Sequence, residues 1–142
     1  MGTSEEIAYI DANVFIYAAL EQGSRGVAAR EIVKQIHEGQ FPAATSAITF
    51  DEIVHVVRKE SDIQRSIAAG IAFLHCDNLQ LIAVDKSLLH HALDVIRHHN
   101  LRAKDAIHYA TMRVKGIKTI VSNDSDFDKI KEIVRKPIEK AL

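Results

Sequence analysis

Residues 7–13 read Ile7-Ala8-Tyr9-Ile10-Asp11-Ala12-Asn13, a short apolar run that passes directly into polar residues. Isoleucine and tyrosine favour extended backbone, and the aspartate and asparagine that follow are typical of the end of a strand. The next stretch, Val14 to Leu20, can form a helix. The pattern therefore predicts a strand, a loop and then a helix.

The same alternation continues along the chain. Further strands are predicted at 41–45, 79–84 and 118–121, with an edge strand at 133–135. Apolar residues at helical spacing predict helices at 25–37, after Ser46, at 63–74, 86–98 and 103–114. Strands separated by helices predict an α/β protein, with three layers (α/β/α) and a central, mainly parallel sheet of four or five strands.

Three residues are expected to end or begin these helices. Ser46 and Asp85 are each placed to cap the helix that follows them, because their side-chain oxygens can accept a backbone N–H bond. Gly116 is expected to end the helix before it.

Composition restricts the class of protein. With 142 residues and no linker or repeat, one domain is expected over 1–142. No apolar run approaches the roughly 20 residues of a membrane span, and Met1 to Glu6 lacks a signal-peptide layout. A single cysteine, Cys76, excludes an intrachain disulfide, so a cytoplasmic protein is expected. The net charge of −1 argues against a broad basic surface for nucleic acid, so any such contact must be local and assisted by metal ions.

Acidic residues stand in apolar surroundings at four separate places. Asp11 follows the first strand, Glu52 lies within a helix, Asp105 opens another, and Asp124 and Asp126 follow the strand at 118–121. In open parallel sheets, the ligand site lies beyond the carboxyl ends of the strands. A sheet with crossover helices can gather these carboxylates at that edge.

Such a cluster needs compensation, because two carboxylates 4 Å apart repel by about 4 kcal/mol at an effective dielectric near 20. The groups must hold protons at raised pKa or bind divalent cations. Oxygen ligands select hard ions such as Mg²⁺ or Mn²⁺, which serve phosphoryl chemistry.

Four segments resemble the motifs of the PIN-domain ribonucleases, in the right order along nearly the whole chain. They are YIDANVFIY at 9–17, TFDEI at 49–53, DAIHYA at 105–110 and VSNDSDF at 121–127. Within that family, the chain looks closest to the VapC-type toxins and their stand-alone archaeal relatives. The resemblance implies a PIN-like fold and a metal-dependent endoribonuclease, in which an activated water attacks the phosphodiester in line and leaves a 5′-phosphate.

The resemblance also implies roles for individual residues. The catalytic and metal-binding acids would be Asp11, Glu52, Asp105 and Asp124, with Asp126 as a fifth metal ligand, for one or two Mg²⁺ or Mn²⁺ ions. Asn13 would orient Asp11 or a metal-bound water, and Ser122, where many relatives have threonine, would play a similar supporting part. Independently of the resemblance, Arg102, Lys104 and Arg113 are candidate contacts to the RNA backbone because they lie near Asp105, with solvated helix charges as the alternative.

Asp51 is a rival to its neighbour Glu52. Adjacent helical residues point about 100° apart, so only one of the two can face the site. Glu52 is favoured, on the expectation that Phe50 and Ile53 pack inward.

Other functions remain open. A di-iron carboxylate protein would use Glu52 with His55 and Asp105 with His108, but it needs a four-helix bundle. A catalytically inactive PIN-like module would bind RNA or protein without cleavage. A phosphoaspartate receiver also uses clustered aspartates, but this sequence has no suitably placed acidic pair after its first strand.

Partners follow from the same resemblance. RNA is the expected substrate, of unspecified sequence, and a toxin would be bound by a small antitoxin with a basic residue in the acidic pocket. Apolar helix faces at Ile32–Ile36 and Ile63–Leu74 suggest a homodimer, with core packing as the alternative.

Overall fold

The computed structural model describes residues 6–142. Residues 1–5 therefore lie outside the described part of the chain. They include the start of the predicted 1–142 domain and most of the segment Met1 to Glu6, for which no signal-peptide layout was expected. Among the residues from 6 onward, no helix is long and apolar enough to cross a membrane.

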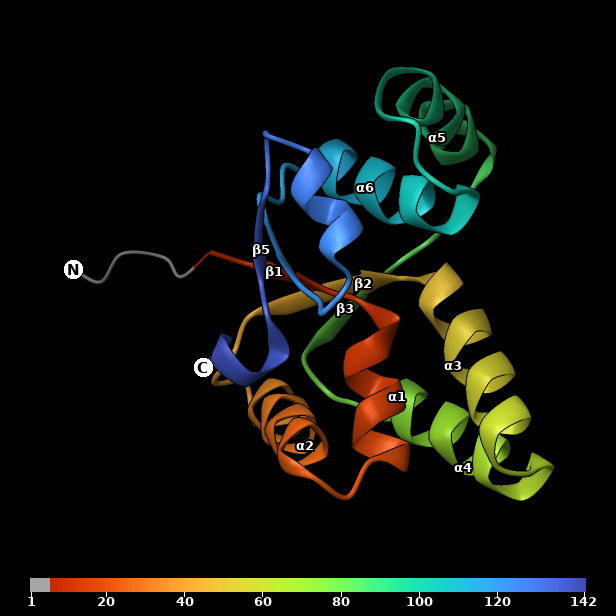
Figure 1. Ribbon diagram of the computed structural model, residues 1–142, viewed down its shortest axis with the longest axis vertical. Helices are drawn as coiled ribbons and strands as arrows, with labels where there is room; N and C mark the ends of the chain where they lie inside the picture. The colour runs from red at the N-terminus through yellow and green to blue at the C-terminus, as the bar shows by residue number, and fades with distance from the viewer. Residues whose placement is uncertain (1–5) are drawn as a thin grey trace.

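Five parallel strands form one sheet in the order β3-β2-β1-β4-β5 (Figure 1). Their bounds are β1 (Ala8–Ile10), β2 (Ala43–Ser46), β3 (Leu79–Ile82), β4 (Thr119–Val121) and β5 (Val134–Lys136). The predicted strands are confirmed, and the mainly parallel sheet proves to be parallel throughout the part of the chain described. The carboxyl ends of all five strands therefore lie at one edge.

Six α-helices connect these strands. Their bounds are α1 (Ala12–Leu20), α2 (Ser24–His37), α3 (Ala47–Glu60), α4 (Ile63–Leu74), α5 (Lys86–His99) and α6 (Ala103–Lys115). Two 3₁₀ helices, η1 (Ser125–Lys129) and η2 (Ile138–Lys140), flank β5. Each predicted helix is confirmed, with ends that differ by a few residues at most.

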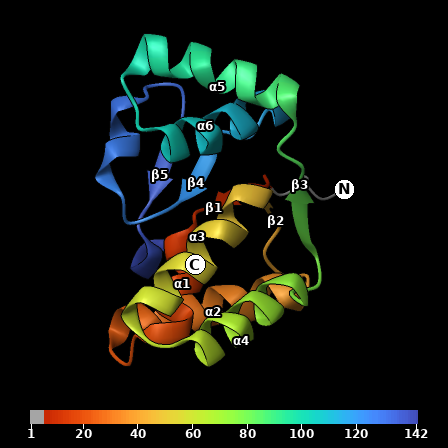
Figure 2. The same cartoon turned by 90° about the vertical axis from the view of Figure 1, so that its right-hand side faces the viewer.

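The helices cover both faces of the sheet, as the three-layer prediction requires (Figure 2). Tyr9 points from β1 into the core beneath α5 and α6. Its neighbours Ala8 and Ile10 point the other way, into the core formed with α1 to α4. Alternation along one three-residue strand thus contributes to two cores.

The predicted caps fare differently. Asp85 caps α5 by accepting a 2.9 Å bond from the Leu88 N–H, and Gly116 ends α6 in the left-handed conformation at φ 69°, so both are confirmed. Ser46 is the N-cap residue of α3, as predicted, but its side chain makes no cap bond, so the expected hydrogen bond is absent. The Ser46 hydroxyl instead accepts a hydrogen bond from Tyr9.

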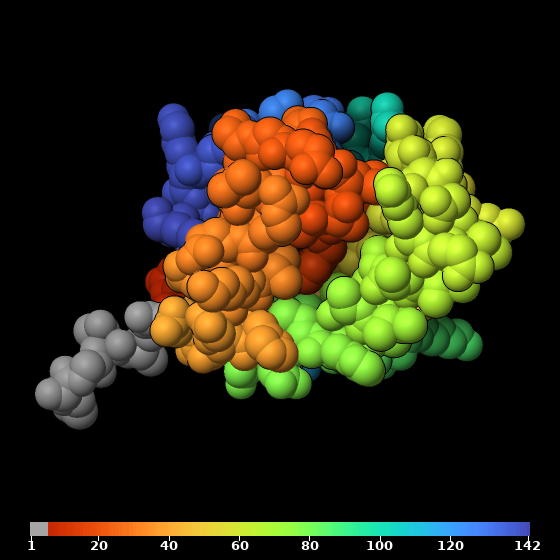
Figure 3. All heavy atoms as spheres, turned by 90° about the horizontal axis from the view of Figure 1, so that it is seen from below, coloured from red at the N-terminus to blue at the C-terminus, as the bar shows by residue number. Residues whose placement is uncertain are grey.

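The two helix faces from which a homodimer was inferred also differ. Ile32 and Ile36 of α2 are fully buried in the core, which is the alternative explanation. Helix α4 lies on the face of the molecule seen from below in Figure 3. A stripe of apolar side chains along this helix is 48–57% exposed. It consists of Ile63, Ile67, Ile71 and Leu74. Of these two faces only that of α4 is therefore open, and the homodimer stays a prediction.

Candidate active site

The site lies where the strand order reverses, at the carboxyl ends of the adjacent strands β1 and β4. The chain turns sharply after β1, and the Asp11 carboxylate caps α1 by accepting a 2.7 Å bond from the Ala12 N–H. The Asp11 backbone N–H donates to the Val121 carbonyl at 3.1 Å. These bonds fix Asp11 against the end of β4.

Asp11 is only 6% exposed, and its second carboxylate oxygen accepts a 2.5 Å hydrogen bond from the Ser122 hydroxyl. Burial raises the pKa of Asp11, since it disfavours the charged form. His108 and the Ser122 bond act in the opposite direction without cancelling it. A buried carboxylate of this kind either holds a proton or is compensated by a nearby cation.

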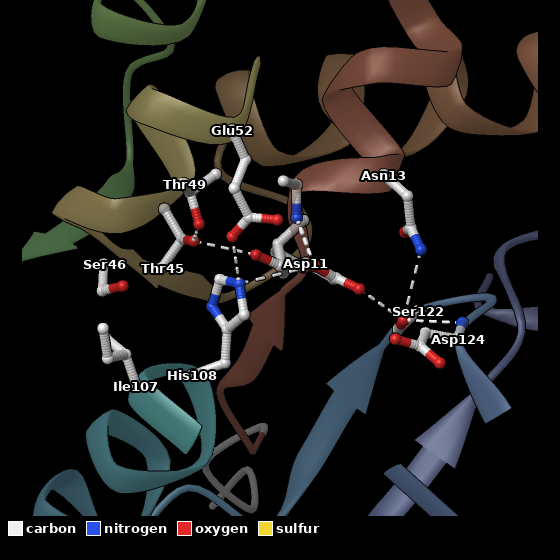
Figure 4. Close-up of polar contacts among 12 residues, drawn as sticks. Asp11, Asn13, Thr45, Ser46, Thr49, Glu52, Ile107, His108, Ser122 and Asp124 are labelled. Atoms are coloured by element: carbon white, nitrogen blue, oxygen red, sulfur yellow. Dashed lines mark hydrogen bonds and ion pairs between the residues drawn. The ribbon is translucent and has the colours of Figure 1, made fainter. Parts of the chain in front are cut away.

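Glu52 extends toward Asp11 from α3, and His108 extends toward it from α6 (Figure 4). His108 Nε2 lies 2.6 Å from Glu52 Oε1 and 3.7 Å from Asp11 Oδ1. Burial alone would lower the pKa of His108, but Tyr9, Glu52 and Asp11 together hold it well above its ordinary value of 6.5. One imidazole thus joins two of the predicted acids.

Tyr9 lies on the other side of this imidazole. Its hydroxyl donates a 2.9 Å bond to Ser46 Oγ, and the same oxygen lies 2.6 Å from His108 Nδ1. The sequence motifs did not identify Tyr9, Ser46 or His108 as one network. The available signal was a histidine among apolar helical residues (Ala106, Ile107, Tyr109 and Ala110), a position that places a polar ring in the core.

A second acidic group consists of Asp105, Asp124 and Asp126, with carboxylate oxygens within 4.8 Å of one another. All three are partly exposed. Burial, followed by the charge of Asp124, raises the pKa of Asp105 from 3.8 to about 6. Asp124 caps η1 by accepting a 2.9 Å bond from the Asp126 N–H, which keeps both residues at this edge.

Ser122 connects the two groups. Its hydroxyl donates to Asp11 and accepts from the Asp124 backbone N–H at 2.9 Å and from Asn13 Nδ2 at 3.3 Å. Asn13 Oδ1 is buried and has no hydrogen-bond partner among the described residues. An unpaired buried amide oxygen next to the acids can accept from a water or face a cation.

The residues present fit a hard divalent cation. Carboxylate oxygens dominate both groups, and the unpaired Asn13 oxygen lies beside them. Oxygen donors of this kind suit Mg²⁺ and Mn²⁺. The raised pKa of Asp11 and Asp105 is the electrostatic cost that such a cation would relieve.

Several predicted residues lie away from the acids. Asp51 is exposed while Glu52 turns toward His108. Arg102 and Lys104 are exposed at the start of α6, beside Asp105. Arg113 lies eight residues further along α6, about 12 Å by helical rise, and pairs with Asp94 at 3.6 Å.

The di-iron alternative does not match this arrangement, because a parallel sheet replaces the four-helix bundle it requires. His55 is exposed, and Asp105 and His108 belong to different groups although they share α6. The expectation for Phe50 was also wrong in part. Phe50 is 39% exposed and packs against Phe73, whereas Ile53 is fully buried.

Comparison with known proteins agrees with the architecture. A family model described as "PIN domain" matches residues 8–133. The ribonuclease VapC13 of Mycobacterium tuberculosis is 25% identical over 130 residues, which cover 89% of this chain and 96% of that protein. The crystal structure of M. tuberculosis VapC20, a sarcin-ricin loop cleaving toxin, matches with a TM-score of 0.72 at 20% identity, over 89% of this chain and 95% of the other. A toxin-antitoxin complex from Klebsiella pneumoniae matches with a TM-score of 0.61 at 22% identity, over the same shares. The predicted PIN-like fold is confirmed.

Proposed function

This chain belongs to the PIN domain family, and we propose that it is a metal-dependent endoribonuclease. The observation that carries the proposal is the meeting of acids from four segments at one sheet edge, where Ser122 links Asp11 to Asp124. The similarity to a protein named as a ribonuclease supports RNA as the substrate. The acids by themselves support phosphodiester hydrolysis.

The reaction adds water to a phosphodiester and releases a 3′-hydroxyl and a 5′-phosphate. One or two Mg²⁺ or Mn²⁺ ions would be held by Asp11, Glu52, Asp105, Asp124 and Asp126. When bound, such an ion lowers the pKa of a water and neutralises charge that develops on the phosphate.

The remaining residues would position the Asp11 carboxylate, a water molecule and the RNA backbone. Ser122 and the Ala12 N–H hold the two oxygens of Asp11, so its carboxylate has a fixed direction. The free Asn13 oxygen is available to a water beside Asp11. Arg102 and Lys104, exposed next to Asp105, are the cations placed to contact an RNA backbone there.

We further propose that the chain is the toxin of a type II toxin-antitoxin pair and acts in the cytoplasm. The similarity to a toxin-antitoxin complex and to a cleaving toxin supports this assignment. A small antitoxin would place a basic residue in the acidic pocket. Co-expression with the product of an adjacent upstream gene tests it: the toxin assignment predicts a purified complex without nuclease activity, and a fully active mixture contradicts it.

The experiment that tests the nuclease is cleavage of an RNA panel by pure protein with Mg²⁺, Mn²⁺ or a chelator. We expect metal-dependent cleavage by the wild type, none with chelator, and none with Asp11→Asn. Equal cleavage by Asp11→Asn would assign the activity to a contaminant. RNA binding without cleavage under every condition would favour the catalytically inactive module.

A further inference from the structure

His108 lies within the DAIHYA segment at 105–110, but the roles that the resemblance implies do not include it. It is fully buried on α6, between Tyr9 on β1 and Glu52 on α3. Both ring nitrogens are 2.6 Å from an oxygen. A histidine with two such short contacts has its ring plane and its tilt defined.

Hydrogen-bond accounting assigns each nitrogen. Tyr9 has one hydroxyl proton, and it is donated to Ser46 Oγ. The Tyr9 oxygen is therefore an acceptor toward His108, so Nδ1 carries a proton. The opposite nitrogen, Nε2, is directed at the carboxylate of Glu52, which is an acceptor.

We propose that His108 is a positioning residue for the nuclease site, whose Nε2–H holds Glu52 Oε1 beside Asp11 while Tyr9 and Ser46 fix the ring. This inference rests on the proposed function, in which Glu52 is a ligand of the metal ion. The Nε2 atom lies 3.7 Å from Asp11 Oδ1, so the donor that holds Glu52 also faces Asp11, which Ala12 and Ser122 hold in place.

Glu52 needs such a partner. Its side chain has several rotatable bonds and extends from α3, and the residue is only partly buried. Fixing a glutamate costs conformational entropy, which the hydrogen bond from His108 offsets before any ligand binds. Loss of a residue that orients a ligand typically costs 10–100-fold in metal affinity or activity.

Two substitutions at one position separate the two sides of the ring. His108→Asn keeps a polar group near Nδ1 but cannot reach Glu52, whereas His108→Gln places an amide N–H close to the position of Nε2. Tyr9→Phe keeps the ring of residue 9 and removes the contact to Nδ1. His55→Asn, on the exposed face of α3, is the matched control.

The readout is Mn²⁺ affinity, measured by calorimetry on variants whose folding is checked by circular dichroism, with RNA cleavage recorded in parallel. We expect His108→Asn to bind Mn²⁺ roughly 10–100-fold more weakly. His108→Gln should stay close to the wild type, Tyr9→Phe should show a smaller loss, and His55→Asn should show none. A purely structural histidine would lower the melting temperature of both His108 variants and leave the Mn²⁺ affinity of the folded protein unchanged.

Several results would overturn the inference. One is wild-type Mn²⁺ affinity in folded His108→Asn; should that variant not fold, wild-type affinity in Tyr9→Phe has the same force. Another is a ¹⁴N coupling in the electron-spin-echo spectrum of bound Mn²⁺, because it would make His108 a ligand. If the wild type neither binds Mn²⁺ nor cleaves RNA, the proposed function itself is wrong. If the wild type does both and the His108 variants match it, only the role of His108 is wrong.

Discussion

The Ser122 hydroxyl donates a 2.5 Å hydrogen bond to Asp11 Oδ2 across the boundary between β4 and β1. The Ser122 hydroxyl oxygen also accepts a 2.9 Å hydrogen bond from the backbone N–H of Asp124. One hydroxyl therefore ties the acid of the first strand to the loop that carries the last acids. The parallel pairing of Ile10 with Val121 brings these positions together although 111 residues separate them along the chain.

We expect Ser122→Ala to weaken Mn²⁺ binding and RNA cleavage by roughly 10–100-fold, because Asp11 loses the donor that orients it. Ser122→Thr keeps the hydroxyl and should retain most of both. Calorimetry with Mn²⁺ and single-turnover cleavage measure the two effects. A Ser122→Ala protein with wild-type Mn²⁺ affinity would show that the bond does not position Asp11.

Glu52 and Asp51 form a matched pair on α3. Glu52 contacts His108 and belongs to the same group of side chains as Asp11, whereas Asp51 is exposed. We expect Glu52→Gln to abolish metal-dependent cleavage and Asp51→Asn to leave it near the wild-type rate. Both variants remove one negative charge, so the comparison controls for net charge. Equal losses in the two would mean that charge alone, and not position, determines activity.

The fold could be predicted because each element has a local signal. The run at 7–10 and the polar turn after it predicted β1 and its loop, and strands alternating with helices predicted a parallel sheet. The expected side-chain bond of one helix cap is missing, because a tertiary contact competes with the local one. Ser46 has the sequence of a helix cap, but Tyr9 from another strand takes its hydroxyl.

The acids of the candidate site, with Asn13 and Ser122 beside them, could be proposed from four motifs, but the network of Tyr9, Ser46 and His108 could not. Spacing placed His108 on the same helical face as Asp105, yet the two side chains diverge toward different acidic groups. That divergence depends on how α6 lies between α3 and η1, which no local pattern specifies. Tyr9 looked like an ordinary strand residue for the same reason, since its partners are 37 and 99 residues away.

Asp124 and Asp126 should contribute unequally. Asp124 is tied to Ser122 through its backbone, while Asp126 lies 3.7 Å from the ammonium of Lys129, a counter-charge that competes with a metal. We expect Asp124→Asn to reduce cleavage more than Asp126→Asn. Single-turnover rates at saturating Mn²⁺ compare them. A larger loss in Asp126→Asn would make Asp126 the main fourth acid.

Asp105 should destabilise the metal-free protein at neutral pH. Its folded-state pKa of about 6 lies above its ordinary value of 3.8, so between these values the folded protein binds the proton more tightly than the unfolded chain does. Stability contributed by the protonated acid is therefore lost as the pH rises through 6. A shift of this size is worth roughly 3 kcal/mol when fully buried, and screening at this partly exposed group reduces it to about 1 kcal/mol.

Asp105→Asn should accordingly raise the free energy of unfolding of chelated protein at pH 7 by about 1 kcal/mol. The same variant should lose the stabilisation that Mn²⁺ gives the wild type. Urea unfolding with and without chelator measures both effects. A destabilised Asp105→Asn protein in chelator would mean that the carboxylate has a structural partner and is not held at an electrostatic cost.

The Mn²⁺ affinity should depend on pH for the same reason. Asp105 must be ionised to bind a cation, and burial raises the pKa of Asp11 as well, so protons compete with the metal. We expect affinity to rise between pH 5 and 7, by up to about tenfold per pH unit below 6 from Asp105 alone, and to level off above. Calorimetry across this range, with Asp105→Asn as the comparison, measures the effect. Because the substituted amide has no proton to lose in this range, the variant should bind more weakly throughout and show a shallower dependence near pH 6; an unchanged slope would place the competing proton on another group.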